Sequence, residues 1–177
     1  MCFCDAAVTA APVPTPIGFG RKYLVPAASA QVERAAPVGR FRCDARSGPR
    51  QEAHVELFAD RRALLLPPGI GMAPPLRRQG AEVTEARCSY ALRTTAPTVV
   101  VQFLAAEHPT LRDLFAIWGQ PLGPDRLAGF RGRVSAFVAG KPYRGDVAAI
   151  PLTRHEEVVL EIGGYIPPHS FFLFSTS

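Results

Sequence analysis

The sequence predicts an α+β fold: an antiparallel, β-rich sheet with one main packed helix over about residues 110–118, preceded by an extended N-terminal arm. Three observations lead to this prediction. Short runs of β-branched and aromatic residues recur along the chain and are bounded by Gly and Pro. One segment carries the i, i+3, i+4, i+7 apolar spacing of an amphipathic helix. The first 40 residues are rich in Pro and Ala and show no sustained period.

The chain divides into three parts. With 177 residues, of which 47% are hydrophobic, it is long enough for one domain with a sizeable core. Residues 1–40 are expected to be an extended arm, because their composition buries too little apolar surface to offset the entropy of ordering them. Residues 41–163 are expected to form a single globular α+β domain, and residues 164–177 an apolar, aromatic C-terminal tail.

Six strands are expected in the globular part. They cover residues 54–60, 63–66, 88–93, 98–104, 133–138 and 156–162. The first strand carries apolar residues in both of its alternating sets, which indicates that it is mostly buried. Residues 72–87 contain Pro74, Pro75 and Gly80, and we expect them to form a loop.

The expected helix has clear start and stop signals. Thr110 suits the N-cap position, and Asp113 stands where the acidic partner of a capping box is found. An apolar stripe follows at Leu111, Leu114, Phe115 and Trp118. Gly119 then ends the helix. A sheet covered by one such helix is similar in outline to a β-grasp.

Charge and motifs exclude several functions. Lys and Arg outnumber Asp and Glu by 20 to 15, but the arginines are scattered as singles and pairs, so no nucleic-acid partner is expected. No apolar run approaches the ~20 residues of a membrane-spanning helix, and no ordinary signal peptide is visible. Cys2 and Cys4 alone are too few ligands for a metal site. Motifs such as Walker A, G-x-S-x-G or H-E-x-x-H are absent, so we expect neither catalysis nor a cofactor.

Residues 39–162 resemble a family of uncharacterised bacterial envelope proteins, whose members often carry an N-terminal membrane anchor. Two motifs carry most of the resemblance: the run Trp118-Gly119-Gln120-Pro121-Leu122, and the run Phe137-Val138-Ala139-Gly140-Lys141-Pro142-Tyr143. Further matching landmarks lie in order at residues 42–43, 53–58, 68–71, 88–90, 110–115 and 150–156. The family pattern reads H-x-H-x-H-L-x-x-F, then P-A-G-I-G, T-L-x-x-F-F-x-x-W-G-Q-P-L and F-V-N-G-K-P-Y-x-G-D.

This chain departs from the family at the histidines, which suggest a transition-metal site in other members. The first histidine run is replaced by Arg50, Glu52 and His54, so that only the third histidine is kept. The later histidine positions hold Arg93, Thr95 and Val101. A metal site needs three or four ligands, so His54 alone is a weak candidate and no metal is expected.

Cys43 and Cys88 match family positions. They precede the first expected strand and begin the third, so they could be neighbours across the sheet. In an oxidising envelope compartment they would form a disulfide that closes a loop of ~45 residues and contributes on the order of 3–4 kcal/mol. The alternative is a pair of reduced thiols in a cytosolic protein.

Two function classes follow. The first is a non-catalytic structural or interaction subunit that docks on a larger, membrane-associated complex on the periplasmic or extracytoplasmic side; a photosynthetic or respiratory complex is one candidate. Its partners would be protein subunits, with a contact to the membrane interface. The anchoring side chains would be Ile17, Phe19, Tyr23 and Leu24 in the arm, and Tyr165, Phe171, Phe172 and Phe174 in the tail. The alternative is a copper- or zinc-binding envelope protein or enzyme, as the histidine-rich family members suggest.

Overall fold

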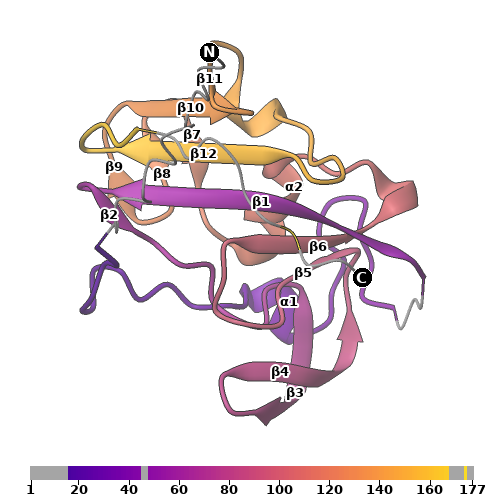
Figure 1. Cartoon of the computed structure of the whole chain (residues 1–177). Coiled ribbons are helices and arrows are strands. Elements are labelled where there is room, and N and C mark those ends of the chain that lie inside the picture. Colours follow the sequence, from indigo (N-terminus) through magenta and orange to yellow (C-terminus); the bar gives the residue numbers. More distant parts are fainter. Residues whose placement is uncertain (1–15, 45–47, 168–173, 175–177) are drawn as a thin grey trace, which may run out of the picture.

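A seven-stranded sheet forms the centre of the computed structural model, which describes residues 16–44, 48–167 and 174. Its strands are β1 (Arg50–Ala59), β2 (Arg62–Ala63), β5 (Leu92–Arg93), β6 (Val100–Leu104), β10 (Val134–Val138), β11 (Lys141–Tyr143) and β12 (Glu157–Ile162). They follow the order β11-β10-β12-β1-β6-β5, with β2 paired to β1 (Figure 1). The predicted α+β, strand-rich class with one main helix is confirmed.

The two central strands, β1 and β12, run parallel, with His54 opposite Glu157 and Ala59 opposite Ile162. The other strand pairs in this sheet are antiparallel. The prediction of an antiparallel sheet therefore fails at its centre, because a parallel pair depends on a long crossover that local sequence patterns do not reveal. A parallel pair from the two ends of the domain, flanked by antiparallel strands and covered by a helix, matches the expected β-grasp outline.

Helix α2 (Leu111–Trp118) covers one face of the sheet and lies behind it in Figure 1. Its capping box is present: Asp113 Oδ2 accepts hydrogen bonds from the Thr110 amide at 2.9 Å and from the Thr110 hydroxyl at 3.1 Å. Gly119 ends the helix with a φ of 74°, a left-handed conformation that favours glycine. Both predicted ends of the helix are therefore confirmed.

Both faces of the two central strands are buried. The core that contains α2 includes Ala53, Val55 and Leu57 of β1 with Val158, Leu160 and Ile162 of β12. Because side chains alternate along a strand, the residues between them point to the opposite face. These include His54, Glu56, Phe58, Val159 and Glu161, which are also buried.

Short elements complete the described fold. They are α1 (Ala30–Glu33), the 3₁₀ helices η1 (Ala105–Glu107) and η2 (Val147–Ala149), and a small sheet of β7 (Leu122–Gly123), β8 (Arg126–Leu127) and β9 (Phe130–Arg131). Among the residues that the structure describes, no helix has the length and apolar character needed to cross a membrane.

Residues 72–87, expected to be a loop, instead belong to a hairpin of β3 (Met72–Gln79) and β4 (Glu82–Ser89) that projects from the domain (Figure 1). The register shifts between Ala73 and Leu76, where the two prolines lie. A bulge lets the ladder pass residues that have no amide donor. The prolines therefore interrupt the pairing without ending it, which is why the loop prediction was wrong.

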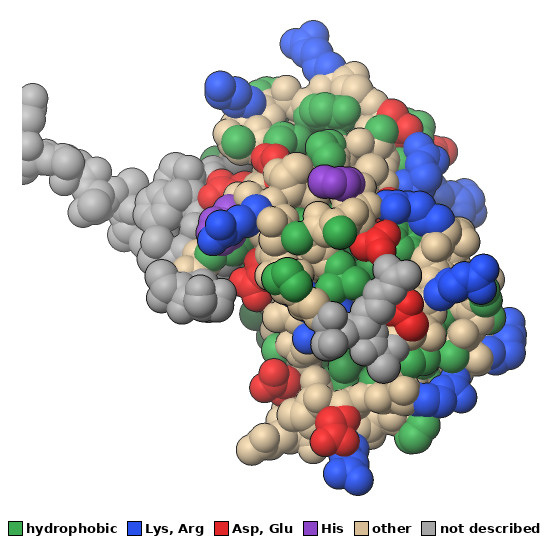
Figure 2. All heavy atoms as spheres, turned by 90° about the vertical axis from the view of Figure 1, so that its right-hand side faces the viewer, with side chains coloured by type: hydrophobic (Ala, Val, Ile, Leu, Met, Phe, Trp, Pro, Cys, Tyr) green, Lys and Arg blue, Asp and Glu red, His purple; other side chains and the backbone are tan. Residues whose placement is uncertain are grey.

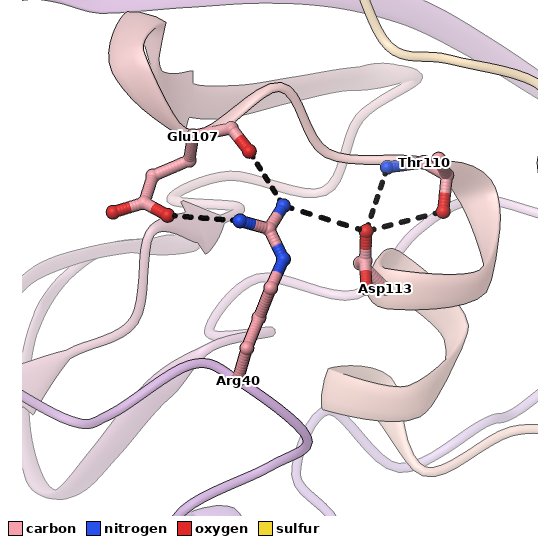
Figure 3. A network of polar contacts seen from close by, with 4 residues as sticks. All are labelled: Arg40, Glu107, Thr110 and Asp113. Carbon is pink, nitrogen blue, oxygen red and sulfur yellow. Dashed lines mark hydrogen bonds and ion pairs between the residues drawn. The ribbon is translucent and has the colours of Figure 1, made fainter.

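The domain itself holds the described part of the predicted arm. Val32 in α1 is fully buried, and the Tyr90 hydroxyl donates a hydrogen bond to the Ala36 carbonyl. Arg40, at the end of the arm, lies beside the N-terminus of α2, where its guanidinium is 3.3 Å from Glu107 Oε2 and 3.9 Å from Asp113 Oδ2 (Figure 3). Residues 16–40 are therefore packed along the globular part.

Candidate interaction surface

The segment 16–24 is attached to the sheet by one isolated backbone bridge. Ile17 forms a parallel bridge with Ala63 of β2. The Gly18 amide donates to the Ala63 carbonyl at 2.8 Å, and the Ala63 amide donates to the Pro16 carbonyl at 2.9 Å. These backbone bonds fix the position of the segment without using its side chains.

A tight turn and an aromatic contact hold the rest of this segment. The Tyr23 amide donates to the Gly20 carbonyl at 3.0 Å, and the Tyr23 ring lies 5.5 Å from the ring of Phe130. A methyl group on Gly18 would overlap the Tyr23 ring, so a larger residue there would displace the ring or the backbone. Tyr23 is half-buried and joins the segment to the domain, whereas the other predicted anchors of the arm are exposed.

Lys22 lies at the centre of a small polar and aromatic cluster. It pairs with Asp60 in the turn after β1, and its ammonium nitrogen is 5.1 Å from the centre of the Phe130 ring. The hydrogen bond to Asp60 raises the pKa of Lys22 above its usual value. The segment therefore contacts the β1–β2 turn and β9 as well as β2.

The exposed large apolar side chains of the described residues all lie in the two segments that the sequence singled out. Phe19 is 81% exposed, Leu24 75%, Tyr165 62% and Ile17 41%. Other large apolar residues within residues 16–44 and 48–167 are buried or half-buried. This concentration marks residues 16–24 and 164–167 as the candidate interaction surface.

The C-terminal segment folds back on the sheet after Gly163 and Gly164. The Ile166 amide donates to Glu161 Oε1 at 3.1 Å, and the Tyr165 ring lies 6.0 Å from the ring of Phe137 on β10. Phe174 stacks on His155 with ring centres 4.3 Å apart. Phe171 and Phe172 lie outside the described residues, as do Cys2 and Cys4.

Cys43 and Cys88 form a disulfide with an S–S distance of 2.01 Å and Cα atoms 5.5 Å apart. The bond joins Cys43, three residues after the arm, to strand β4, next to a bridge between Asp44 and Ser89. The predicted pairing is confirmed, and such bonds are typical of proteins that fold in oxidising compartments.

His54 is buried on β1, where its Nε2 lies 3.6 Å from Glu56 Oε1. The other positions at which the resembled family has histidines are on β1, on β5, on β6 and in the connection between β5 and β6. Glu52 accepts a hydrogen bond from Gln102 Nε2 at 3.2 Å, and Gln102 Oε1 accepts one from Arg93 Nε at 3.1 Å. A cavity of about 210 Å³ opens beside them, lined in part by Glu52, Gln102 and Thr95.

These residues do not form a suitable metal-binding site. Within the part of the chain that the structure describes, no group of three or more His, Cys, Asp or Glu side chains is arranged to hold one. Arg50 donates to the Ala91 carbonyl at 2.8 Å, and burial, with the charge of Arg93, lowers its pKa to about 10. Two guanidinium groups beside a cation site would repel the cation.

The sequence did not reveal how the basic residues gather. The arginine pair Arg61 and Arg62 is isolated in the sequence, but in the fold it lies beside residues 16–24, and residues 131–133 are at the same end of the sheet. The available signal was that these arginines directly follow or precede expected strands. Only the parallel pairing of β1 and β12 places those strand ends together.

Comparisons with known proteins identify no relative: no family model, no curated protein and no solved structure matches the chain. The resemblance to the envelope family therefore stays a prediction.

Proposed function

We propose that the chain is a non-catalytic interaction subunit, a divergent member of the envelope family, that docks on a larger membrane-associated assembly outside the cytoplasm. The N-terminal segment 16–24 and the C-terminal tail would carry the contacts. An energy-converting complex, photosynthetic or respiratory, is one assembly of this kind.

The main support for this proposal is the location of the exposed apolar side chains. Ile17, Phe19 and Leu24 fall within eight residues, and Tyr165 lies just beyond the last strand. Exposing such side chains to water is unfavourable, and a contiguous apolar patch usually marks a contact surface. Ala63 exchanges backbone hydrogen bonds with Pro16 and Gly18, on either side of Ile17, so the segment is ordered before any partner binds.

The disulfide supports a location outside the cytoplasm. Cys43 and Cys88 covalently join two segments that are 45 residues apart in the sequence, and such a bond persists where the surroundings are oxidising. The metal-binding alternative has weaker support, because Arg50, Arg93 and Thr95 occupy positions where ligands would be needed.

Co-purification tests the proposal. The full chain would be tagged in its own organism, membranes would be solubilised in a mild detergent, and the proteins recovered with the tag would be quantified. We expect fixed partners in constant ratio, which are lost when Phe19→Ser is combined with Leu24→Ser or when residues 165–177 are deleted.

The control carries Gln79→Ser and Glu82→Ser at the tip of the β3–β4 hairpin, where both side chains are exposed. Its partners should be retained. Recovery of the unaltered chain alone, or of the same partners with every variant, would contradict the proposal. Stoichiometric copper or zinc in the purified protein would favour the metal-binding alternative.

A further inference from the structure

Six exposed basic residues gather at the end of the sheet where β1 and β12 finish, the left-hand end in Figure 1. We call this surface the basic end; its residues are Arg21, Lys22, Arg61, Arg62, Arg131 and Arg133. They come from three segments that are distant in the sequence.

The sheet topology explains this gathering. Because β1 and β12 are parallel, Ala59 and Ile162 end side by side. Val134, the first residue of β10, pairs with Ile162 and brings Arg131 and Arg133 to the same edge. The bridge between Ile17 and Ala63 adds the N-terminal segment, and the contact of Lys22 with Phe130 joins it to β9.

The charge balance at this end is one-sided. Within residues 16–24, 60–63 and 125–133 the exposed carboxylates are Asp60, which pairs with Lys22, and Asp125. Six exposed cationic side chains thus stand against two carboxylates, while the whole chain has a net charge of +5. The opposite end of the molecule, which faces the viewer in Figure 2, shows side chains of both signs interspersed.

Exposed apolar side chains stand among these cations. Phe19 and Leu24 are the two most exposed large apolar residues that the structure describes, and Arg21 and Lys22 lie between them in the sequence. No matched pocket is needed for projecting apolar groups to enter the interfacial region of a bilayer. Cavities of about 100 and 210 Å³ lie near the start of β1, at the other end of the sheet.

We propose that the basic end binds an anionic lipid surface, with Phe19 and Leu24 entering the headgroup region and β1 and β12 running toward the membrane. Each Lys or Arg held near such a surface strengthens binding through its attraction to the lipid phosphates, and the apolar side chains add to this attraction. The inference rests on the proposed function in assigning this end to docking, and it names the bilayer as what the end touches.

Vesicle sedimentation of the full chain tests the inference without any partner protein. We expect the chain to bind vesicles of phosphatidylcholine with about 30% phosphatidylglycerol, and not vesicles of phosphatidylcholine alone, near 0.1 M salt. Raising the salt to about 0.5 M should weaken binding at least tenfold, because exposed charges are then screened.

Charge reversal locates the site. Arg61→Glu with Arg62→Glu should weaken binding to the anionic vesicles at least tenfold. Arg131→Glu with Arg133→Glu should have the same effect. The second pair keeps the test decisive if the first pair impairs folding. Phe19→Ser with Leu24→Ser should weaken binding to the vesicles, and the dependence of binding on salt should stay unchanged. The control is Arg77→Glu with Arg78→Glu, an exposed pair on β3 that should have little effect.

Equal binding to both kinds of vesicle, no binding to either, or an equal loss with the Arg77 and Arg78 control would overturn the inference. If the chain ignores vesicles but loses its co-purified partners on reversal of Arg61 and Arg62, the basic end docks on an acidic protein surface. That outcome removes the lipid inference and leaves the proposed function intact. Lipid binding without any fixed protein partner would support the lipid inference and contradict the proposed function.

Discussion

Trp118, in the last turn of α2, donates a hydrogen bond from its indole Nε1 to the carbonyl oxygen of Pro26 at 2.8 Å. The indole ring is fully buried, so its single donor has a partner in the N-terminal segment. This bond joins the main helix to Pro26, two residues after the segment 16–24 that carries exposed apolar side chains.

Replacing Trp118 by Phe should loosen the N-terminal segment. The variant loses the hydrogen bond to Pro26 and part of the ring volume, for a combined cost of about 1–3 kcal/mol. Trypsin should then cut faster after Arg21, Lys22 or Arg34, as followed by mass spectrometry of native protein. Leu111→Val is the control, since it removes core volume at the opposite end of α2 from Trp118; equal cleavage of the two variants would refute the role of the bond.

Replacing Gly18 by Ala should also release this segment, by a different route. The added methyl group would overlap the Tyr23 ring, so either the ring or the backbone pairing with Ala63 must move. We expect amide hydrogen exchange of Ala63, which donates to the Pro16 carbonyl, to rise at least tenfold.

Gly129→Ala is the matched control, because a Cβ there meets no atom within 4 Å. It should leave exchange at Ala63 unchanged. Unaltered exchange in the Gly18 variant would show that Tyr23 yields without disturbing the pairing.

Local signals in the sequence predicted the elements whose cause is local. Thr110 and Asp113 are three residues apart, and their capping box needs nothing beyond the helix itself. The strand around His54 was predicted for a similar reason, since its apolar residues alternate within one segment.

Long-range pairing explains what the sequence could not reveal. The parallel neighbour of His54 is Glu157, about a hundred residues away, and the gathering of Arg61 with Arg133 depends on that pairing. The hairpin over residues 72–89 was missed because Pro74 and Pro75 lie at a register shift, where prolines are tolerated. Phe19 and Leu24 were predicted as anchoring side chains of the arm, but the backbone bonds that hold this segment to Ala63 were not predicted.

Removal of the disulfide should lower the free energy of unfolding by on the order of 3–4 kcal/mol. The unfolded chain then gains conformational entropy, because two residues that are 45 apart are no longer held together. The variant with Cys43→Ala and Cys88→Ala would be compared with the unaltered protein by urea denaturation. A variant with Cys2→Ser and Cys4→Ser keeps the bond and should match the unaltered protein. Labelling of Cys43 and Cys88 by a thiol reagent without reductant would contradict the bond itself.

Glu161 should make the stability of the fold depend on pH. The carboxyl group lies on β12 and is 2% exposed, and burial raises its pKa above the usual value of 4.5, opposed by the hydrogen bond from the Ile166 amide. A raised pKa means that the folded state holds the proton more tightly than the unfolded chain does. The folded state is therefore penalised once pH rises above the unfolded value, and the penalty is complete above the folded value.

Glu161→Gln keeps an oxygen for the Ile166 amide and cannot ionise, so it should be more stable than the unaltered protein at pH 7. The difference should shrink as pH falls through the raised pKa and vanish below about pH 4, where both chains are neutral at this position. Urea denaturation across this range measures it, and taking the difference between the two proteins cancels the other titrating groups. A Gln variant that is less stable at pH 7 would show that the carboxylate is favoured in the folded state, opposite to the effect of its burial.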